Sequence, residues 1–522
     1  MTADPRHRKV GMSHWSIVVL IALASIGLYA NTLGNAFLWD DKFLIVGNPR
    51  IRSLRHLPSL FASDFSAPSD VHGKSGYYRP ATMGSYAADY AVWGMNPKGF
   101  HLTNVLVHTL NVVLVYALAF LLLRNRLASA LAGGIFAVHP VHTESVAWVS
   151  GRTDLLCASF LLLAFLSFSR ISCSVGWRQT THRLASPLFF LFALWSKETA
   201  IVLPILLIAY DGYFGPKARP RHWVKRHVSY WIVALLYLLS RVLILGGIGP
   251  ETIHRNRGIY RTFLTSIKMV GLYVKQIFYP IPLNAELDMA LPKSLFEVPV
   301  LSALLAGAAL IVAVLRTAKT SKPVSFGIFW FFVALLPVLQ IVPLQELVAE
   351  RFLYIPSIGF AIALSALLSC AYRLMSRRWA RRLMVGGIAI LMAMCAYTIR
   401  ERNRDWKDEI TLYSATIRDA PESPRAHYNL GTIYLGRKQY DRAIRFLREA
   451  VRLNPDYVEA FYNLACAYAL KGEKELAMWA LHQAVRKGLR DVRYIEGDPD
   501  LESLKDDPRF QALMRRLRAR RF

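Results

Sequence analysis

The sequence predicts an all-α membrane protein, with a polytopic helical domain of about eleven spans followed by a C-terminal array of helical repeats. Three observations lead to this prediction. The chain has 522 residues, of which 54% are hydrophobic, and its mean hydropathy of +0.30 is too high for an ordinary soluble protein. Long apolar runs alternate with short basic loops up to about residue 398, and a 34-residue period follows.

The apolar runs are the predicted membrane spans. We expect them near 14–33, 101–123, 128–145, 155–170, 185–196, 199–210, 229–246, 298–315, 324–343, 352–372 and 383–397. The run 263–281 contains Lys268 and Lys275, and counting it as a span would place a basic loop on the wrong side, so we predict an interfacial or re-entrant segment. The basic N-terminus has no convincing cleavage site before the first acids, which indicates an uncleaved anchor.

The net charge of +28 is distributed as a membrane topology requires. Many of the cations lie in short loops between spans, such as Arg124 and Arg126, or the group from Arg373 to Arg382. The positive-inside bias therefore places the N-terminus in the cytoplasm and the C-terminal domain outside, and it explains the charge without nucleic acid as a partner. The five cysteines form no CxxC pair, so the sequence supports neither a disulfide framework nor a cysteine metal site.

The C-terminal region carries an internal repeat. Tyr428-Asn429-Leu430-Gly431 recurs as Tyr462-Asn463-Leu464-Ala465, an offset of 34 residues that is typical of tetratricopeptide repeats. We predict a membrane domain at 1–398, with a first outer loop at about 34–100, and a repeat domain at 399–522. Within the latter we expect repeats at 424–457 and 458–491 and flanking helices at 404–420 and 499–518. Such arrays usually bind a peptide or a partner protein, although this one could also be a spacer or an assembly surface.

Unusual polar residues gather on the predicted outer side. Asp40 and Asp41 follow the first span, and acids beside a span are functional candidates because charge is costly near the bilayer core. The other candidates on this side are Arg79, His101, His139, His142, Glu144, Arg152, Asp154, Lys197, Glu198, Glu350, Arg351 and Tyr354. Carboxylates, histidines and cations at one membrane surface suggest a reaction centre for an anionic, partly lipidic substrate.

Each cluster also has a structural interpretation. His139, His142 and Glu144 could bind a metal, but their spacing matches no known motif, so we assign no metal ligands. Local ion pairs could join Glu350 to Arg351, Lys197 to Glu198, and Arg152 to Asp154. Within the second span, His108 and Asn111 are better explained as interhelical hydrogen-bond partners than as catalysts.

Several of these segments resemble one family along nearly the whole chain. The stretches FLWDD, YYRPATMGSYAADYAVWG, GFHLTNVLVHTLN, FAVHPVHTESVAWVSGRTDLL, WSKE and AERFLYIPSIGF, followed by the repeats, resemble the transmembrane and tetratricopeptide-repeat protein O-mannosyltransferases. The resemblance implies a glycosyltransferase-C fold, a polyprenyl-phosphate-linked sugar as donor, and an acid of the first loop as base. The repeat array is short compared with animal members, which leaves the protein acceptor open.

Combining these inferences, we expect an enzyme that transfers a mannose-like sugar from a polyprenyl phosphate to a hydroxyl group, such as a protein Ser or Thr, on the extracytoplasmic face. Asp40 or Asp41 would be the base, with Asp40 preferred, and the other acid would position the acceptor. Arg79, Lys197 and Arg351 would contact the donor phosphate. His101, His139, His142, Glu144, Arg152, Asp154, Glu198, Glu350 and Tyr354 would bind the substrates.

Two other classes remain open at this stage. A non-enzymatic scaffold anchored in the membrane would explain the repeats, but not the polar cluster. A transporter would place charges at mid-membrane depth on broken helices, whereas most of these lie near span ends. The short array and the lack of retention signals favour the plasma membrane of a prokaryote over an endoplasmic reticulum.

Overall fold

The computed structural model describes residues 13–66, 75–215, 220–247, 258–287 and 289–519. These residues form helices and contain no strand. The chain divides into two compact units, Met1–Leu283 with Met289–Trp406, and Asn284–Asp288 with Lys407–Phe522. The predicted boundary at 398 falls inside a helix that runs on to Asp405, so the units divide eight residues later than the sequence suggests.

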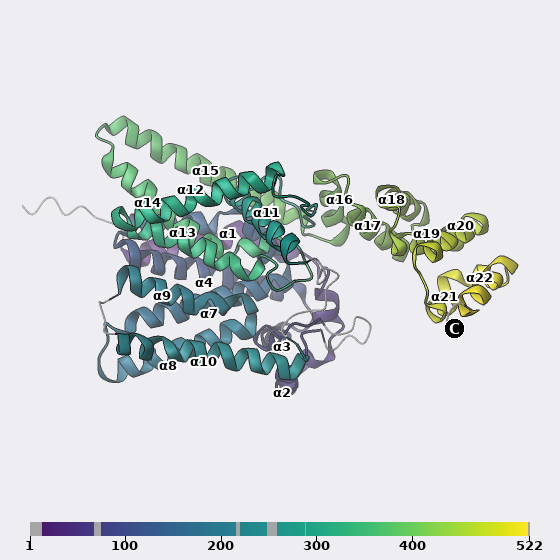
Figure 1. Cartoon of the computed structure of the whole chain (residues 1–522), viewed down its shortest axis with the longest axis horizontal. Coiled ribbons are helices and arrows are strands. Elements are labelled where there is room, and N and C mark those ends of the chain that lie inside the picture. The colour runs from purple at the N-terminus through teal and green to yellow at the C-terminus, as the bar shows by residue number, and fades with distance from the viewer. Residues whose placement is uncertain (1–12, 67–74, 216–219, 248–257, 288, 520–522) are drawn as a thin grey trace, which may run out of the picture. The chain divides into compact units, whose positions relative to one another are not determined.

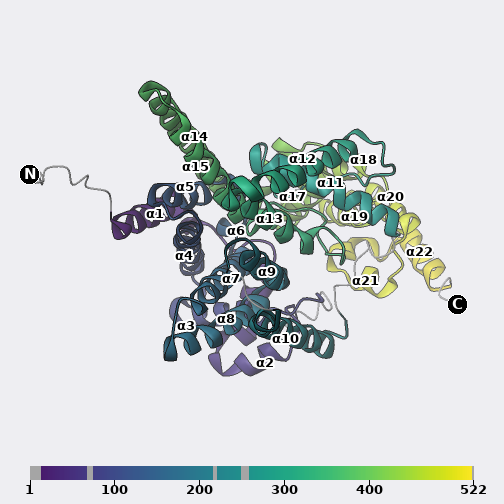
Figure 2. The same ribbon diagram turned by 60° about the vertical axis from the view of Figure 1, so that its left-hand side comes forward.

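The first unit is a bundle of long helices that run alongside one another (Figure 1). Its helices are α1 (His14–Tyr29), α2 (Leu57–Phe61), α3 (Pro80–Trp93), α4 (Pro97–Leu123), α5 (Arg126–Ala137), α6 (Thr143–Ala147), α7 (Arg152–Ile171), α8 (Gly176–Ser196), α9 (Leu203–Phe214), α10 (Pro220–Leu245), α11 (Ile259–Phe278), α12 (Val298–Thr320), α13 (Lys322–Leu335), α14 (Pro356–Leu374) and α15 (Arg378–Asp405). The short helices α2 and α3 belong to the first predicted loop and pack against α8 and one another (Figure 2).

Every predicted span overlaps one of these helices. Among the described residues, seven helices are long and apolar enough to cross a membrane, and α5 and α13 are shorter apolar helices. The run expected to be interfacial or re-entrant forms α11. The chain is therefore a multi-pass membrane protein, as its composition predicts. The N-terminal residues before Ser13 and the basic residues Lys217 and Arg219 lie outside the described residues.

Local sequence signals set the limits of the helices. Asn96 precedes Pro97 and caps α4 by accepting a hydrogen bond from the backbone N–H of Lys98 at 3.1 Å. Asn125 caps α5 in the same way, so the two helices are joined by a tight turn. Short connections of this kind make successive helices antiparallel. Contacts between residues of the segments that follow α1, α5, α8, α13 and α15 place these segments at the same end of the bundle.

Two glycines allow a close contact between α13 and α14. A Cβ atom on Gly327 of α13 would collide with the carbonyl oxygen of Gly359 on α14, and the reverse also holds. Small residues at such a crossing let two backbones approach, which is how helices gain contact energy in a lipid environment. This crossing fixes the start of α14 and with it the polar turn that precedes that helix.

The second unit is a stack of helix pairs. Its helices are α16 (Glu409–Asp419), α17 (Pro424–Gly436), α18 (Tyr440–Leu453), α19 (Val458–Lys471), α20 (Lys474–Lys487), α21 (Val492–Gly497) and α22 (Pro508–Ala519), with a 3-10 turn at Pro499–Leu504 between the last two. The predicted repeats correspond to α17 with α18 and to α19 with α20, which pack as two hairpins.

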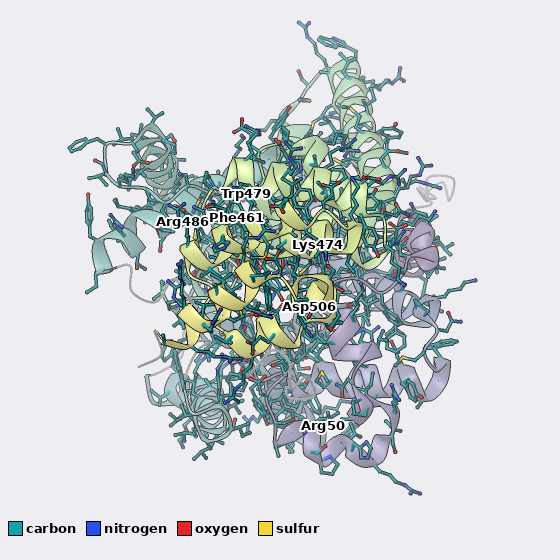
Figure 3. All side chains as sticks on the ribbon, turned by 90° about the vertical axis from the view of Figure 1, so that its right-hand side faces the viewer. Arg50, Phe461, Lys474, Trp479, Arg486 and Asp506 are labelled. Carbon is teal, nitrogen blue, oxygen red and sulfur yellow. The ribbon has the colours of Figure 1, made fainter. Side chains whose placement is uncertain are left out.

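Small residues permit this stacking. Gly431 of α17 lies against Leu447 of α18, and a Cβ atom there would meet the leucine side chain at 2.7 Å. The first flanking helix begins at a capping box, in which Asp408 and Thr411 exchange hydrogen bonds. On the face seen in Figure 3, the half-exposed Trp479 lies edge-on to Phe461, with ring centroids 6.0 Å apart.

Candidate active site

The two acids after the first span have different environments. Asp41 is fully buried, and its carboxylate accepts hydrogen bonds from the backbone N–H of Leu38 at 3.0 Å and of Ser150 at 2.9 Å, and from the Ser150 hydroxyl at 2.5 Å. Burial raises the pKa of Asp41 to about 7, against the lowering effect of these hydrogen bonds. Asp40 is only partly buried. Asp41 therefore joins the turn to a distant segment, and Asp40 is the more accessible acid.

A group of tryptophans shapes the turn that carries these acids. Trp39 has a positive φ of 48°, which is unfavourable for a bulky residue. Its ring packs edge-on against Trp148, at 5.5 Å between centroids, and against Trp406, at 5.1 Å. The indole N–H of Trp148 donates to the carbonyl of Leu38 at 3.3 Å. These contacts hold the backbone in the conformation that presents Asp40.

Arg351 lies over the ring of Trp148. Its guanidinium carbon is 5.4 Å from the ring centroid of Trp148, and its side chain forms an ion pair with the buried Glu144. The backbone N–H of Arg351 also donates to Glu144, at 2.8 Å. Arg351 remains 16% exposed. A chain of contacts thus connects the turn at Asp40 to a cation 311 residues later in the sequence.

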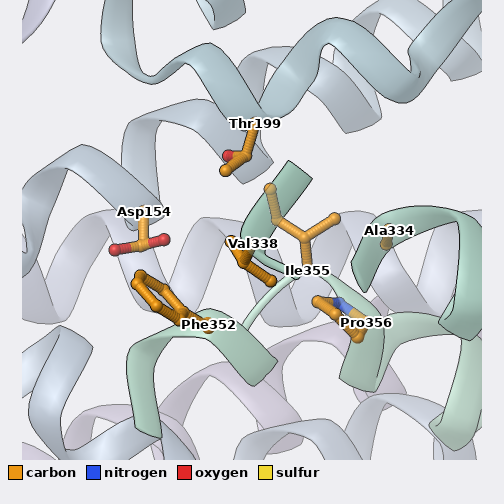
Figure 4. A pocket seen from close by; sticks show the side chains of 7 residues that line it. All are labelled: Asp154, Thr199, Ala334, Val338, Phe352, Ile355 and Pro356. Atoms are coloured by element: carbon orange, nitrogen blue, oxygen red, sulfur yellow. The ribbon is translucent and has the colours of Figure 1, made fainter. Parts of the chain in front are cut away.

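Lys197 follows in this chain of contacts. Its ammonium group lies 2.7 Å from each carboxylate oxygen of Asp154 and 5.4 Å from the ring centroid of Phe352. Asp154 and Phe352 also line a small pocket together with Thr199, Ile355 and three other residues (Figure 4). Burial lowers the pKa of Lys197, and the charges of Arg79 and Arg351 act in the same direction, whereas Asp154 opposes them. Arg79 and Arg351, the two other predicted phosphate-binding cations, are thus within electrostatic range of Lys197.

Arg79 forms the third cation site. Its guanidinium donates to both carboxylate oxygens of Glu198, at 2.7 and 3.1 Å, and stacks over Tyr77 at 4.2 Å. Burial would raise the pKa of Glu198, but Arg79 and nearby cations lower it to about 2. The pair is held in place but remains partly accessible to solvent, because the two side chains are 12% and 17% exposed.

Lys197, Glu198 and Arg351 form ion pairs with residues that are distant in the sequence. Lys197 and Glu198 are neighbours in sequence, yet the first pairs with Asp154 and the second with Arg79. Arg351 pairs with Glu144. Adjacent residues at the start of a 3-10 turn point in different directions, so each finds its partner on another element.

The side chain of Arg152 is held by protein groups from neighbouring helices. Its side chain is fully buried, and the guanidinium lies 2.5 Å from Asp89, donates to Asn104 at 2.8 Å and to the carbonyl of Phe100 at 2.7 Å. It does not pair with Asp154, contrary to the prediction of a local pair. These partners join α3, α4 and α7, which indicates a structural role for Arg152 rather than a direct one in substrate binding.

The histidines and Tyr354 form a buried network beneath the cations. The Tyr354 hydroxyl lies 2.7 Å from His108 Nδ1 and accepts from Asn111 at 3.1 Å, which confirms the predicted interhelical role of these two residues. His142 lies 2.8 Å from the Ser357 hydroxyl. Like Tyr354, His142 is held by protein groups.

The two remaining histidines are also enclosed. His139 Nε2 lies 3.0 Å from the carbonyl oxygen of Ile277. The ring of His101 on α4 is fully buried. Among the described residues, the group with metal-ligand geometry is Cys466 with Asp498 and Asp500 in the second unit, and it includes none of the predicted site residues.

Three residues that the sequence did not single out also contact the candidate site. Arg241 of α10 donates to the carbonyl of Gly76 at 2.8 Å and lies 4.0 Å from Glu198. Arg402 of α15 lies 3.8 Å from the buried Glu350, and Trp406 packs on Trp39. An arginine within or at the end of an apolar run was the available signal, since such charges are rare unless they serve a site.

Comparison with known proteins gives consistent results. Residues 424–457 match the tetratricopeptide repeat family, which coincides with the first predicted repeat. The chain resembles protein O-mannosyl-transferases. It is 25% identical to human TMTC3 over 84% of the chain and 51% of that protein, and 26% identical to Tmtc1 of Drosophila melanogaster over 85% and 62%. It is also 29% identical to mouse TMTC4 over 83% and 66%.

The resemblance predicted from the motifs is confirmed by these similarities. The chain spans about half to two thirds of the length of the relatives it matches. Among solved structures, it resembles ArnT from Cupriavidus metallidurans bound to undecaprenyl phosphate, with 12% identity, 91% of this chain and 76% of that chain covered, and a TM-score of 0.42.

Proposed function

We propose that this protein transfers a mannose-like sugar from a polyprenyl-phosphate donor to a hydroxyl group, such as a Ser or Thr of a protein, at the extracytoplasmic face of a prokaryotic plasma membrane. The membrane unit would then have a glycosyltransferase-C architecture. The main support is the arrangement of three cations from distant segments at the bundle end that also carries Asp40. Lys197 and Arg351 both contact the ring of Phe352, and Arg79 pairs with Glu198, the neighbour of Lys197. The similarity to protein O-mannosyl-transferases agrees with it.

Asp40 is the proposed base. It removes the proton from the acceptor hydroxyl while the oxygen attacks the anomeric carbon of the sugar, and the bond from that carbon to the phosphate oxygen breaks. The saturated hydrogen bonding of Asp41 favours a supporting role for it, in which it holds the turn through Ser150. Direct displacement would invert the configuration of the anomeric carbon.

The phosphate leaves with the bonding electron pair, so its negative charge increases in the transition state. Arg351 and Arg79 are suited to stabilise this charge because their guanidinium groups are partly exposed, at 16% and 12%. Phosphate would compete with Glu144 and Glu198 for them. Lys197 is more enclosed and would act at longer range while it fixes Asp154.

The test of this proposal is transfer of labelled sugar from a polyprenyl-phosphate mannose to a Ser/Thr peptide in membranes. Asp40→Asn should lower kcat by about a hundredfold or more, because it removes the base without removing bulk. Glu401→Gln, at an exposed site that pairs with Arg404, is the matched control. Parental rates in both Asp40→Asn and Asp41→Asn would contradict the assignment of the base.

We further propose that the repeats recruit the acceptor. A chain that ends at Trp406 keeps the contact of this residue with Trp39 and should still hydrolyse the donor, but should transfer less sugar to a protein acceptor. Full protein transfer by that truncation would remove the recruitment role. Failure of the full-length protein to use any lipid-linked sugar would favour the alternative of a membrane-anchored scaffold for envelope assembly.

A further inference from the structure

The second unit contains a short piece of chain from far upstream. Asn284–Asp288 lies between α11 and α12 in the sequence, yet it belongs to the same compact unit as the repeats. The side-chain oxygen of Asn284 accepts a hydrogen bond from the backbone N–H of Glu286 at 3.0 Å, which forms a tight turn. The amide of Asn284 donates to the carbonyl of Thr416 at 3.4 Å. This turn directs Glu286 onto the first repeat.

The first repeat binds the carboxylate of Glu286 through hydrogen-bond donors. One oxygen of Glu286 accepts from Arg425 Nε at 2.9 Å and from the side-chain amide of Asn429 at 2.9 Å. The Glu286 side chain is only 6% exposed, whereas Arg425 is 51% exposed. Residues four apart on a helix share one face, so both donors come from the same side of α17.

The sequence shows that this arrangement is particular to the first repeat. At the 34-residue offset, Asn463 corresponds to Asn429, but Glu459 replaces Arg425. Asn463 donates to Thr432 of the first repeat at 2.9 Å rather than to a carboxylate. A negative charge at position 459 would repel an acidic ligand, so the second repeat lacks the cation that makes the first one selective.

We propose that the face of α17 formed by Arg425 and Asn429 is a binding site for a glutamate-bearing segment, and that the chain's own residues 284–287 occupy it as a built-in ligand. An acidic segment of another protein would bind there only by displacing Glu286. The site is therefore selective for a carboxylate and is closed in the resting protein. This inference does not depend on transferase activity.

The experiment measures binding of a labelled peptide with the sequence of residues 282–287, PLNAEL, to the full-length protein in detergent micelles or nanodiscs. The parent should bind it weakly because the site is occupied. Glu286→Gln should bind it at least about tenfold more tightly, since hydrogen bonds to a charged group are worth more than those to a neutral amide. Adding Arg425→Ala to Glu286→Gln should abolish that gain, whereas Arg418→Ala, which removes an exposed pair with Asp419, should not.

Controls separate loss of binding from loss of folding. The PLNAQL peptide should not bind to any variant, and hydrogen exchange of α17 should stay protected in Glu286→Gln. If that variant loses protection, Glu286→Asp, which shortens the carboxylate arm by one methylene, takes its place and should give an intermediate gain. The proposal would be overturned if the parent and Glu286→Gln bound the peptide with equal affinity, or if the gain in affinity remained after adding Arg425→Ala.

Discussion

The ion pairs around the candidate site in the membrane unit and those on the surface of the repeats differ in burial. In the membrane unit, the pairs Arg152–Asp89, Lys197–Asp154 and Arg351–Glu144 have side chains that are at most 16% exposed. In the repeat unit, Arg452–Glu449 and Lys471–Asp441 have side chains that are 36% to 85% exposed. The number of pairs therefore says little about stability or function, because the cost of removing one partner depends on how far water is excluded.

The buried pairs join residues from distant segments, so the position of each cation is defined by the fold. The exposed pairs in the repeats join residues three apart or on adjacent helices, and they mainly keep the surface polar. Four substitutions test this difference, in order of decreasing expected effect.

The largest effect is expected for Arg152→Ala. It leaves Asp89 as a buried charge without its partner and should lower the free energy of unfolding by about 3–5 kcal/mol. Thermal unfolding in detergent measures this loss. Arg152→Lys keeps the charge but not the contacts to Asn104 and Phe100, so its unfolding temperature should lie between those of the parent and of Arg152→Ala. A parental unfolding temperature for Arg152→Ala would show that this pair is no more important than a surface one.

A smaller effect is expected for Glu144→Gln. Because Arg351 is partly exposed, the lost charge–charge contact should cost about 1–3 kcal/mol of stability. The same variant frees Arg351 for an anion, so binding of a polyprenyl phosphate should become tighter. Isothermal titration with the lipid phosphate in nanodiscs tests this, and weaker binding would argue that Glu144 itself contacts the donor.

The third effect concerns pH. The pKa of Asp41 is raised to about 7 in the folded chain, compared with about 3.9 when unfolded. The folded state binds more protons between these values, so this contribution to stability is full below about pH 4 and is lost as the pH rises through about 7. Subtracting the unfolding free energy of Asp41→Asn from that of the parent should give a difference that declines over this range. A difference that does not change with pH would mean that folding does not raise the pKa of Asp41.

No measurable effect is expected for Arg452→Ala. Its partner Glu449 lies three residues away on the same exposed helix face, and both groups are solvated without each other. The unfolding temperature should match that of the parent within error. A clear loss would show that the repeats, like the membrane unit, depend on their ion pairs.

Much of this architecture could be read from the sequence because it follows from local patterns. Apolar runs gave every helix that could span, and the offset from Tyr428 to Tyr462 gave the repeats. The extent of α15 could not be read, since its last turns are polar. They are helical because Asn403 donates to Asn31 and to the carbonyl of Leu28, at 2.8 and 3.2 Å, which are contacts with a helix some 370 residues away.

The sequence alone predicts that the polar motifs share one end of the bundle, because successive membrane spans alternate in direction. Only the tertiary structure decided which carboxylate holds which cation. Glu144 meets Arg351 across 207 residues, and Asp154 meets Lys197 across 43. Charges attract any opposite partner, so the choice is made by the apolar helix packing that brings two side chains together and excludes water from them.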